Sequence, residues 1–390
     1  MTKQVSRHNN PKSGLPSFIF RSLLALVLFS EISAQAELDF VNWETAPIHP
    51  LDFHPERQIL GLTNLPAARL ELYDVTDETP KLLRSIPVGL DPVTVRFYGK
   101  NQAWVICHIS DSINVINLDT FKTVAVIPTL DGPADVVFAG TPLRAYVSCA
   151  FENSVVVYDP ETHENLQTIP IKGERPKAMA VSPDGSHVYV AVFESGNAST
   201  ILAPRFGLGF VPGSAVDFHE GPYDGRNPPP NFGSVFNPPI ATHLKDQAPR
   251  VGLIVKKNHQ GQWMDDNQRD WSEFVSGSKA PLSGRPVGWD MPDRDLAIID
   301  TATDEVEYVS GLMNIGMDVA VSPESGKIAL VGTDALNEVR FEPVLNGHFS
   351  TVNLALIDPS SGEHTTINLN PHLGSVRKRF NEANHRWQPR

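Results

Sequence analysis

Four prolines recur in this chain at an almost constant interval. Pro50, Pro92, Pro133 and Pro176 lie 42, 41 and 43 residues apart. Short stretches rich in valine, isoleucine and alanine recur with them in the same order. A self-similar period of about forty residues is typical of repeat proteins, in which each repeat is one supersecondary unit. The interval therefore restricts the chain to an array of similar units.

Each unit contains four short runs of β-type residues. In the third unit they are residues 133–138, 145–149, 153–159 and 166–171. Residues 155–157 are three consecutive valines, and unbroken apolar runs of this kind indicate strands that are covered on both faces. Four strands form a small twisted sheet that needs a neighbour on each face, as the blade of a β-propeller does. We predict an all-β fold, a β-propeller of four-stranded blades.

Five blades are detectable, and the fourth is too long. They span about residues 50–90, 91–131, 132–174, 175–312 and 313–371. The matching Ser-Pro turns at Pro183 and Pro323 are 140 residues apart, which is about 98 more than one blade requires. The extra residues, 199–292, lie between the second and third strands of the fourth blade. Their first half is rich in proline and glycine, and their second half holds three of the six tryptophans, so we expect that half to be packed.

The two ends of the chain differ from the repeats. The chain starts with four cations, followed by an apolar run at 23–29 and then by the sequence Ala34-Gln35-Ala36. This order predicts a signal peptide of residues 1–36, cleaved after Ala36, and hence a periplasmic or secreted protein. The alternative is an uncleaved anchor, although the apolar run is shorter than the roughly 20 residues that span a bilayer. Residues 37–198 and 293–373 then hold the blades, and residues 374–390 form a tail without a blade pattern.

The blades resemble a known family of exported proteins. The sequence Val181-Ser182-Pro183-Asp184-Gly185 precedes Val188-Tyr189-Val190, and a second copy begins Val319-Ala320-Val321-Ser322-Pro323. These residues, with the strand at 154–159, resemble the YVTN-type β-propeller repeats of bacterial and archaeal exported and surface proteins. The resemblance implies seven blades, so a truncated array is one expectation. A closed ring of five, completed by the segment around Phe40, is the other.

The charge of the chain argues against nucleic acid as a partner. Removal of residues 1–36 takes away four cations and one anion and changes the formal charge from −13 to −16. An acidic surface repels phosphate backbones and anionic lipid head groups. No later apolar run is long enough to span a membrane. We predict no nucleic-acid partner and no membrane span, and leave the protein or small-molecule ligand open.

A binding face is expected at one end of the blades. Loops between the second and third strands lie on the same face of a propeller as the loops that join consecutive blades, so polar residues in them converge there. The candidates for this face are Asp91, His108, Asp111, Asp131, Asp135, Glu152, Glu174, Arg175, Glu194 and Asp334. The alternative for each of them is a solvated turn residue that caps backbone groups.

Metal and thiol chemistry have a few candidates. Asp290, Asp293 and Asp295 could supply oxygens to a divalent cation, although salt bridges to neighbouring arginines are an alternative. Cys107 and Cys149 occupy equivalent places in successive blades, and we expect buried free thiols because equivalent strands of adjacent blades diverge. We predict no other cofactor. The sequence contains no zinc-protease, nucleophile-elbow, phosphate-loop or dinucleotide motif.

Three functional hypotheses follow. The first is an exported, non-enzymatic propeller that presents a binding face built from blade loops and the insertion. The second is a lactonase-like or other metal-assisted hydrolase, an activity that the resemblance to related propellers implies. The third is an electron-transfer partner module, because longer YVTN-like proteins carry cytochrome domains. A propeller fold alone does not decide among them.

Overall fold

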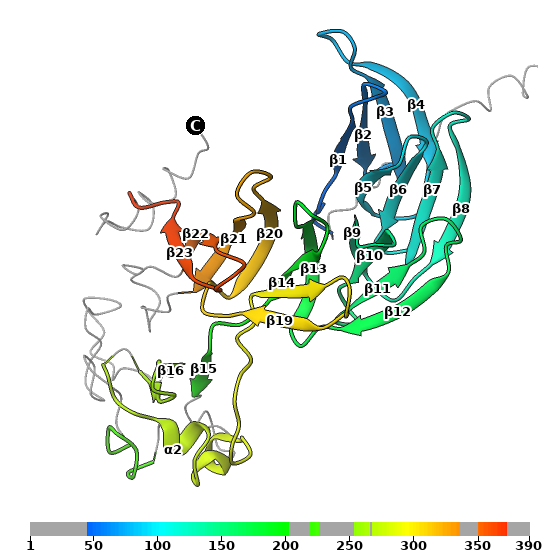
Figure 1. The fold of residues 1–390 in the computed structure, drawn as a ribbon. Helices are drawn as coiled ribbons and strands as arrows, with labels where there is room; N and C mark the ends of the chain where they lie inside the picture. Colours follow the sequence, from blue (N-terminus) through cyan, green and yellow to red (C-terminus); the bar gives the residue numbers. More distant parts are fainter. Residues whose placement is uncertain (1–44, 203–217, 226–252, 266, 336–349, 373–390) are drawn as a thin grey trace, which may run out of the picture. The chain divides into compact units, whose positions relative to one another are not determined.

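The prediction of four-stranded blades is confirmed. We describe a computed structural model of the chain, in which residues 45–202, 218–225, 253–265, 267–335 and 350–372 are described. The predicted signal peptide, the segment around Phe40 and the tail at 374–390 lie outside these residues. Five four-stranded antiparallel sheets follow one another along the described chain. The fold is therefore an all-β propeller (Figure 1).

The five blades have the same strand order, and within each the strands lie side by side in the order in which the chain visits them (Figure 1). The first is β1 (Leu51–His54), β2 (Ile59–Asn64), β3 (Arg69–Asp74) and β4 (Lys81–Pro87). The second is β5 (Pro92–Tyr98), β6 (Gln102–Cys107), β7 (Ser112–Asn117) and β8 (Lys122–Pro128). The third is β9 (Pro133–Ala139), β10 (Arg144–Cys149), β11 (Ser154–Tyr158) and β12 (Asn165–Pro170). The fourth is β13 (Glu174–Val181), β14 (His187–Glu194), β18 (Leu296–Asp300) and β19 (Val306–Val309), and the fifth is β20 (Ile315–Val321), β21 (Ile328–Ala335), β22 (Ser350–Ile357) and β23 (His364–Asn368).

The core of the protein lies between blades. One cluster of buried side chains joins the first blade to the second, and three more join the second to the third, the third to the fourth and the fourth to the fifth. Every residue of β11 is buried, which explains why the sequence of this strand does not alternate. The outermost strands, such as β8, are mostly exposed. The indole of Trp104 is fully buried and meets Phe138 of the next blade edge to face, with the ring centres 5.4 Å apart.

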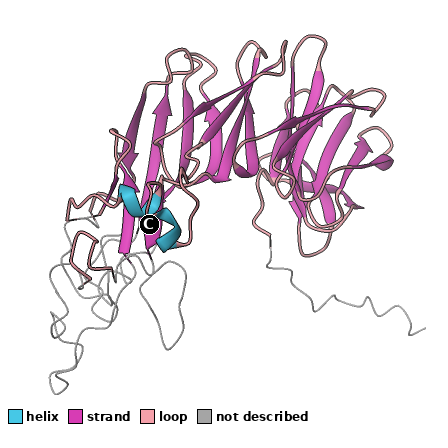
Figure 2. Ribbon diagram, turned by 90° about the horizontal axis from the view of Figure 1, so that it is seen from below, coloured by secondary structure: helices cyan, strands magenta, loops and turns pink. Residues whose placement is uncertain are grey.

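A separate small sheet lies in the chain between β14 and β18. It consists of β15 (Ser199–Leu202), β16 (Leu253–Lys257) and β17 (Trp263–Met264). The helix α2 (Ser272–Val275) and the 3-10 helix η2 (Ala280–Ser283) follow. These are the helices that Figure 2 shows in an otherwise stranded structure. The side chains of this segment have their own apolar cluster, in which Trp263 and Trp271 are buried.

The segment before β1 runs along the second blade. The Ile48 amide donates to the Val93 carbonyl at 3.0 Å, and the Val95 amide donates to the His49 carbonyl at the same distance. His49 thereby forms a parallel bridge with Thr94 of β5. The first strands of successive blades contact one another, so this segment brings His49 close to several of them.

Two further features were expected from the sequence. Cys107 and Cys149 are free and buried, as expected for equivalent strands that diverge. In the part of the chain that the structure describes, we find no helix with the length and apolar character needed to cross a bilayer.

Candidate functional site

A groove of about 760 Å³ lies where the insertion meets the fourth and fifth blades. The insertion contributes Lys256, Lys257, Asn258 and His259, and residues 290–294 come from the segment that leads into β18. Residues 310–313 connect the two blades, and Asp334 stands near the end of β21. We call this the loop groove. It has the size of a site for a small molecule.

A tight turn presents the insertion's residues to the loop groove. The Asn258 carboxamide oxygen accepts hydrogen bonds from the amides of Gln260 and Gln262, at 3.0 and 2.9 Å. Gly261 has a φ of +79°, a conformation that glycine adopts without a steric penalty. This local turn chemistry keeps Lys257 and His259 at the edge of the groove.

Charged residues of the groove are held in place by their neighbours. The Lys257 ammonium lies 2.8 Å from the Asp290 carboxylate. The guanidinium of Arg294 lies over the ring of Tyr308, 5.3 Å from its centre, and donates to the Lys172 carbonyl at 2.9 Å. A stacked guanidinium loses less freedom when it binds an anion than a flexible ammonium does. Arg294 is therefore the best-positioned cation of the groove.

Two carboxyl groups face the loop between the fourth and fifth blades. Asp293 accepts from the Gly311 amide at 3.3 Å, and Asp295 accepts from the Leu312 amide at 2.8 Å. Asp295 is fully buried. Its burial and the nearby charge of Asp293 raise the pKa of this carboxyl to about 7, against the opposing hydrogen bonds from Ser195 and Leu312. Asp295 is not among the described residues that line the groove, so this shift belongs to a buried carboxyl next to the groove residue Asp293.

The predicted cation ligands fall in or beside this groove. Asp290 is paired with Lys257, whereas Asp293 and Asp295 are bound by backbone amides. Within the described ranges, no group of three or more His, Cys, Asp or Glu side chains is arranged to hold a metal ion. A divalent cation prefers six to eight oxygens, so cation binding stays a prediction from the sequence.

The residues predicted for the binding face lie in several separate places. Asp334 lines the loop groove and accepts from the Asn197 side chain at 3.2 Å. Arg175 and Glu194 form an ion pair of 2.9 Å in the fourth blade. Glu174, Asp131 and Glu152 are exposed.

Other members of the predicted set support the blade loops. His108 is buried, and its Nδ1 lies 2.9 Å from the Pro133 carbonyl. The Asp111 carboxylate accepts from the Gly132 amide at 3.0 Å, and the Asp91 carbonyl accepts from the His108 amide at 2.9 Å. The contacts of His108 with Pro133 and of Asp111 with Gly132 join the second blade to the third, and the contact of Asp91 with His108 joins the start of the second blade to its own loop.

Asp135 has a different position. It lies in β9, its side chain is fully buried, and it accepts from the Met179 amide at 2.7 Å. Its carboxylate also lies 2.8 Å from Nδ1 of His49.

Sequence reasoning missed most of the cationic side of the loop groove. Lys256, His259 and Arg294 were not among the candidates because they stand outside the repeated loops. The turn around Asn258 and Gly261 marks a loop tip, and this signal could have identified Lys256 and His259.

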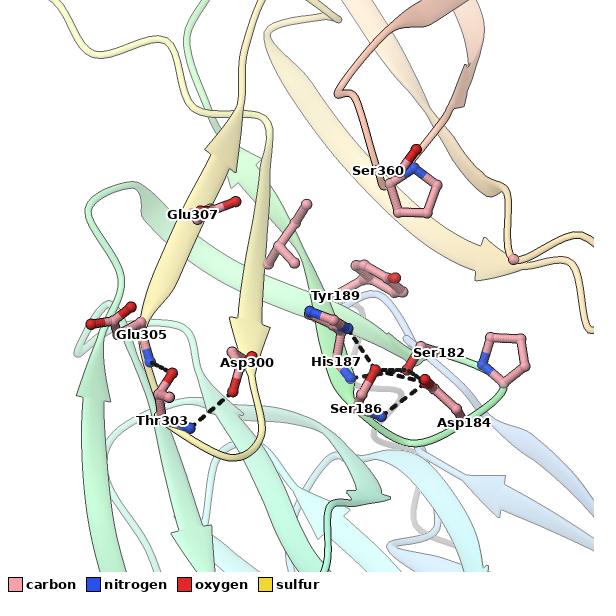
Figure 3. Close-up of a pocket in the computed structure, with 14 residues that line it drawn as sticks. Ser182, Asp184, Ser186, His187, Tyr189, Asp300, Thr303, Glu305, Glu307 and Ser360 are labelled. Carbon is pink, nitrogen blue, oxygen red and sulfur yellow. Dashed lines mark hydrogen bonds between the residues drawn. The ribbon is translucent and has the colours of Figure 1, made fainter.

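A second groove, of about 630 Å³, lies between the fourth and fifth blades (Figure 3). Ser186, His187 and Asp184 meet there, but not in the order that nucleophilic catalysis requires. The Ser186 hydroxyl lies 2.7 Å from both the Asp184 carboxylate and Nδ1 of His187. In a catalytic triad the carboxylate orients the histidine and not the serine. We call this site the interblade groove.

Comparisons with known proteins support the fold. Residues 39–203 match the family described as "Lactonase, 7-bladed beta-propeller", which is related to the YVTN-type propellers that the sequence resembles. No curated protein sequence matches the chain.

Three solved structures illustrate the similarity. Hydrazine synthase from Kuenenia stuttgartiensis is 15% identical, with a TM-score of 0.49 over 86% of this chain and 69% of that one. A functionally unknown protein from Desulfotomaculum acetoxidans is 10% identical, with a TM-score of 0.42 over 82% and 68%. The WD40 β-propeller domain of Doa1 is 8% identical, with a TM-score of 0.43 over 82% and 67%.

Proposed function

We propose that this β-propeller, related over residues 39–203 to the lactonase family, is an exported binding protein whose ligand is a small polar molecule held in the loop groove. The observation that carries the proposal is the convergence of three parts of the chain on one groove. Residues 256–259, 290–294 and 310–313 lie far apart in sequence and line the same space. Sites built in this way combine a rigid scaffold with variable loops.

The chemistry of the groove indicates the class of ligand. Lys256, His259 and Arg294 offer positive charge or hydrogen-bond donors, while Asp293 and Asp334 offer acceptors. A molecule that carries both hydroxyl and carboxylate groups satisfies both kinds of partner. Lactones and the hydroxy acids formed when their rings open belong to this class, and the name of the matching family points the same way.

The insertion supplies the specificity in this proposal. Lys256 and His259 belong to it, whereas the loop at 310–313 belongs to the repeated framework. Both insertion residues are exposed, so each can contact a ligand without a change in the core.

Calorimetric titration with gluconate, a stable hydroxy acid, tests the binding function. We expect Lys256→Gln and His259→Gln each to weaken binding about two- to fivefold, as is typical for exposed charges. Lys122→Gln is the matched control, because Lys122 is an exposed lysine of the outer strand β8. Equal affinity of all four proteins would show that the ligand does not use this groove.

Lactone hydrolysis is the second candidate function. The family match favours it. Asp293 lines the groove and Asp295, two residues further on, is buried, and backbone amides hold both carboxyls. In such a reaction Asp293, which lines the groove, would accept a proton from the water that attacks the lactone carbonyl and pass it to the ring oxygen as the ring opens. The experiment follows acid release from gluconolactone, with and without a chelator. Asp293→Asn should abolish any acceleration over the spontaneous rate, whereas gluconate binding should weaken but persist. No acceleration by the wild-type protein would leave binding as the sole function.

Export is part of the proposal and rests on the sequence of residues 1–36. Expression of the full chain in a bacterium, followed by mass spectrometry of the N-terminus, tests it. A mature chain that begins at Glu37 is expected from the Ala34-Gln35-Ala36 site. A cytoplasmic chain that retains the N-terminal segment would contradict export.

A further inference from the structure

The interblade groove stands at the opposite end of the blades from the loop groove. Gly326, just before β21, lines the interblade groove, and Asp334, near the end of the same strand, lines the loop groove. Eight residues of β-strand extend about 25 Å. A ligand in one groove therefore does not occupy the other, and the interblade groove needs its own explanation.

Four apolar or aromatic residues line part of the interblade groove, and we call this part its floor. Pro183, Tyr189, Ile298 and Pro359 contribute to its lining. The rings of His187 and Tyr189 are nearly parallel, with an interplanar angle of 10° and centres 6.4 Å apart. Figure 3 shows these two rings between the turn that contains Asp184 and the strand that carries Glu307. Such a surface accommodates the aliphatic stem of a long side chain.

Carboxylates also line this groove. They are Asp184, Asp300, Glu305 and Glu307, and among the described residues of the lining there is no lysine or arginine. Hydrogen bonds from the side chains of Ser182 and Ser186 hold the pKa of Asp184 well below its usual range. Backbone amides of Thr303 and Ala302 lower the pKa of Asp300. Both groups therefore stay negatively charged at neutral pH.

The two glutamates differ from the two aspartates. Asp184 and Asp300 are engaged by their own turns, at 2.7 to 3.0 Å. Glu305 and Glu307 are exposed, and within the described residues neither forms an ion pair. Glu307 lies on β19 and Glu305 directly precedes this strand, and both line the groove. Their carboxylates are therefore accessible to a cation that enters from solvent.

We propose that the interblade groove docks an arginine-bearing peptide segment of a partner protein. The stem of the arginine lies against the apolar floor, and its guanidinium is held by Glu305 and Glu307 with the support of Asp184 and Asp300. Arginine fits better than lysine because its planar guanidinium binds two carboxylates at once and stacks on aromatic rings. The inference is independent of the loop groove and its small-molecule ligand.

Titration of the full chain with two synthetic peptides tests this proposal. One is acetyl-(Gly-Arg)3-amide, and the other replaces each arginine by citrulline, which has nearly the same shape but no charge. We expect the arginine peptide to bind and the citrulline peptide to bind at least about tenfold more weakly. Binding should weaken with added salt, because the groove is open to solvent. Equal binding of the two peptides would overturn the proposal.

Matched variants locate the contact. The double variant Glu305→Gln with Glu307→Gln should bind the arginine peptide at least about fivefold more weakly than the wild-type protein does. The control is Glu78→Gln with Glu152→Gln, which removes the same charge from exposed positions of other blades. Both double variants should keep the thermal stability of the wild-type protein. If the control weakens binding as much as the groove variant does, the peptide recognises the overall acidity of the surface and not this groove.

Discussion

Nδ1 of His49 lies 2.8 Å from the carboxylate of Asp135. The two residues are 86 positions apart, His49 just before the first blade and Asp135 in the first strand of the third. The other ring nitrogen of His49 lies 3.3 Å from Asp318 of the fifth blade, and the His49 backbone pairs with the second blade through Thr94. The imidazole of His49 thus contacts the third and fifth blades, and its backbone pairs with the second.

This connection predicts a stability that depends on pH. Burial alone would lower the pKa of His49, but hydrogen bonds to Asp135 and Asp318 outweigh it and raise the pKa to about 9, from 6.5. The stabilisation is fully present below the unfolded-state pKa of 6.5 and is lost as the pH rises through 9. It amounts to at most about 3 kcal/mol. The His49 side chain is 18% exposed, so solvent screens its interactions with the two carboxylates only in part.

Denaturant unfolding of the wild-type protein and of His49→Gln, at pH values from 6 to 10.5, checks this prediction. The difference in the free energy of unfolding between the two proteins should be largest near pH 6 and smallest above pH 10. Nuclear magnetic resonance of the imidazole protons should show a titration near pH 9. A titration near pH 6.5, with equal stabilities throughout, would mean that His49 is not held by the two carboxylates.

The two cysteines are predicted to be unreactive in the native protein. Burial raises the pKa of Cys107 to about 12 and that of Cys149 to about 11. The thiolate is the reactive form of cysteine, so iodoacetamide at pH 8 should label neither residue until denaturant is added. Mass spectrometry of intact protein measures the labels. Rapid labelling of the native protein, or a mass that indicates a disulfide, would contradict buried free thiols.

Asp265 is predicted to hold the insertion together. Its carboxylate accepts from the Tyr223 hydroxyl at 2.5 Å and from the Trp271 indole at 3.1 Å, inside a cluster that is separate from the blades. Asp265→Ala removes the acceptor of these two hydrogen bonds, and we expect a local destabilisation of about 3 kcal/mol. Arg269→Ala is the control, because the side chain of Arg269 is exposed.

Limited proteolysis and tryptophan fluorescence check the Asp265 prediction. Asp265→Ala should be cut faster within the insertion, while the main thermal transition of the blades stays within a few degrees of the wild-type value. Gluconate binding should weaken, because Lys256 and His259 are displaced. A shift of the whole transition would show instead that the insertion and the blades unfold together.

The blades could be predicted from sequence because each strand carries its own signal. Valine runs such as 155–157 reflect burial on both faces. A proline also lies at or near the start of the first strand in four of the five blades. The contacts of His49 could not be predicted, because they depend on how residues 48 and 49 pair with β5. Nothing near His49 in sequence indicates Asp135 or Asp318.

The candidate site could be predicted only in part. The carboxylates at 290–295 and Asp334 stood out as acidic residues near strand ends. The cations Lys256 and His259 come from a turn some eighty residues before Asp334 in the chain. These cations and the carboxylates meet only because the insertion packs against two blades. Spacing along a sequence carries no information on such long-range contacts.

Hydrogen–deuterium exchange with bound gluconate tests most directly whether the loop groove is the ligand site. Slower exchange is predicted in residues 256–259, 290–294 and 310–313, which line the groove. The turn at 182–187, which lines the interblade groove, should exchange as fast with gluconate as without it. Binding that protects the interblade groove, or that leaves all three loop-groove segments unchanged, would contradict the proposed site.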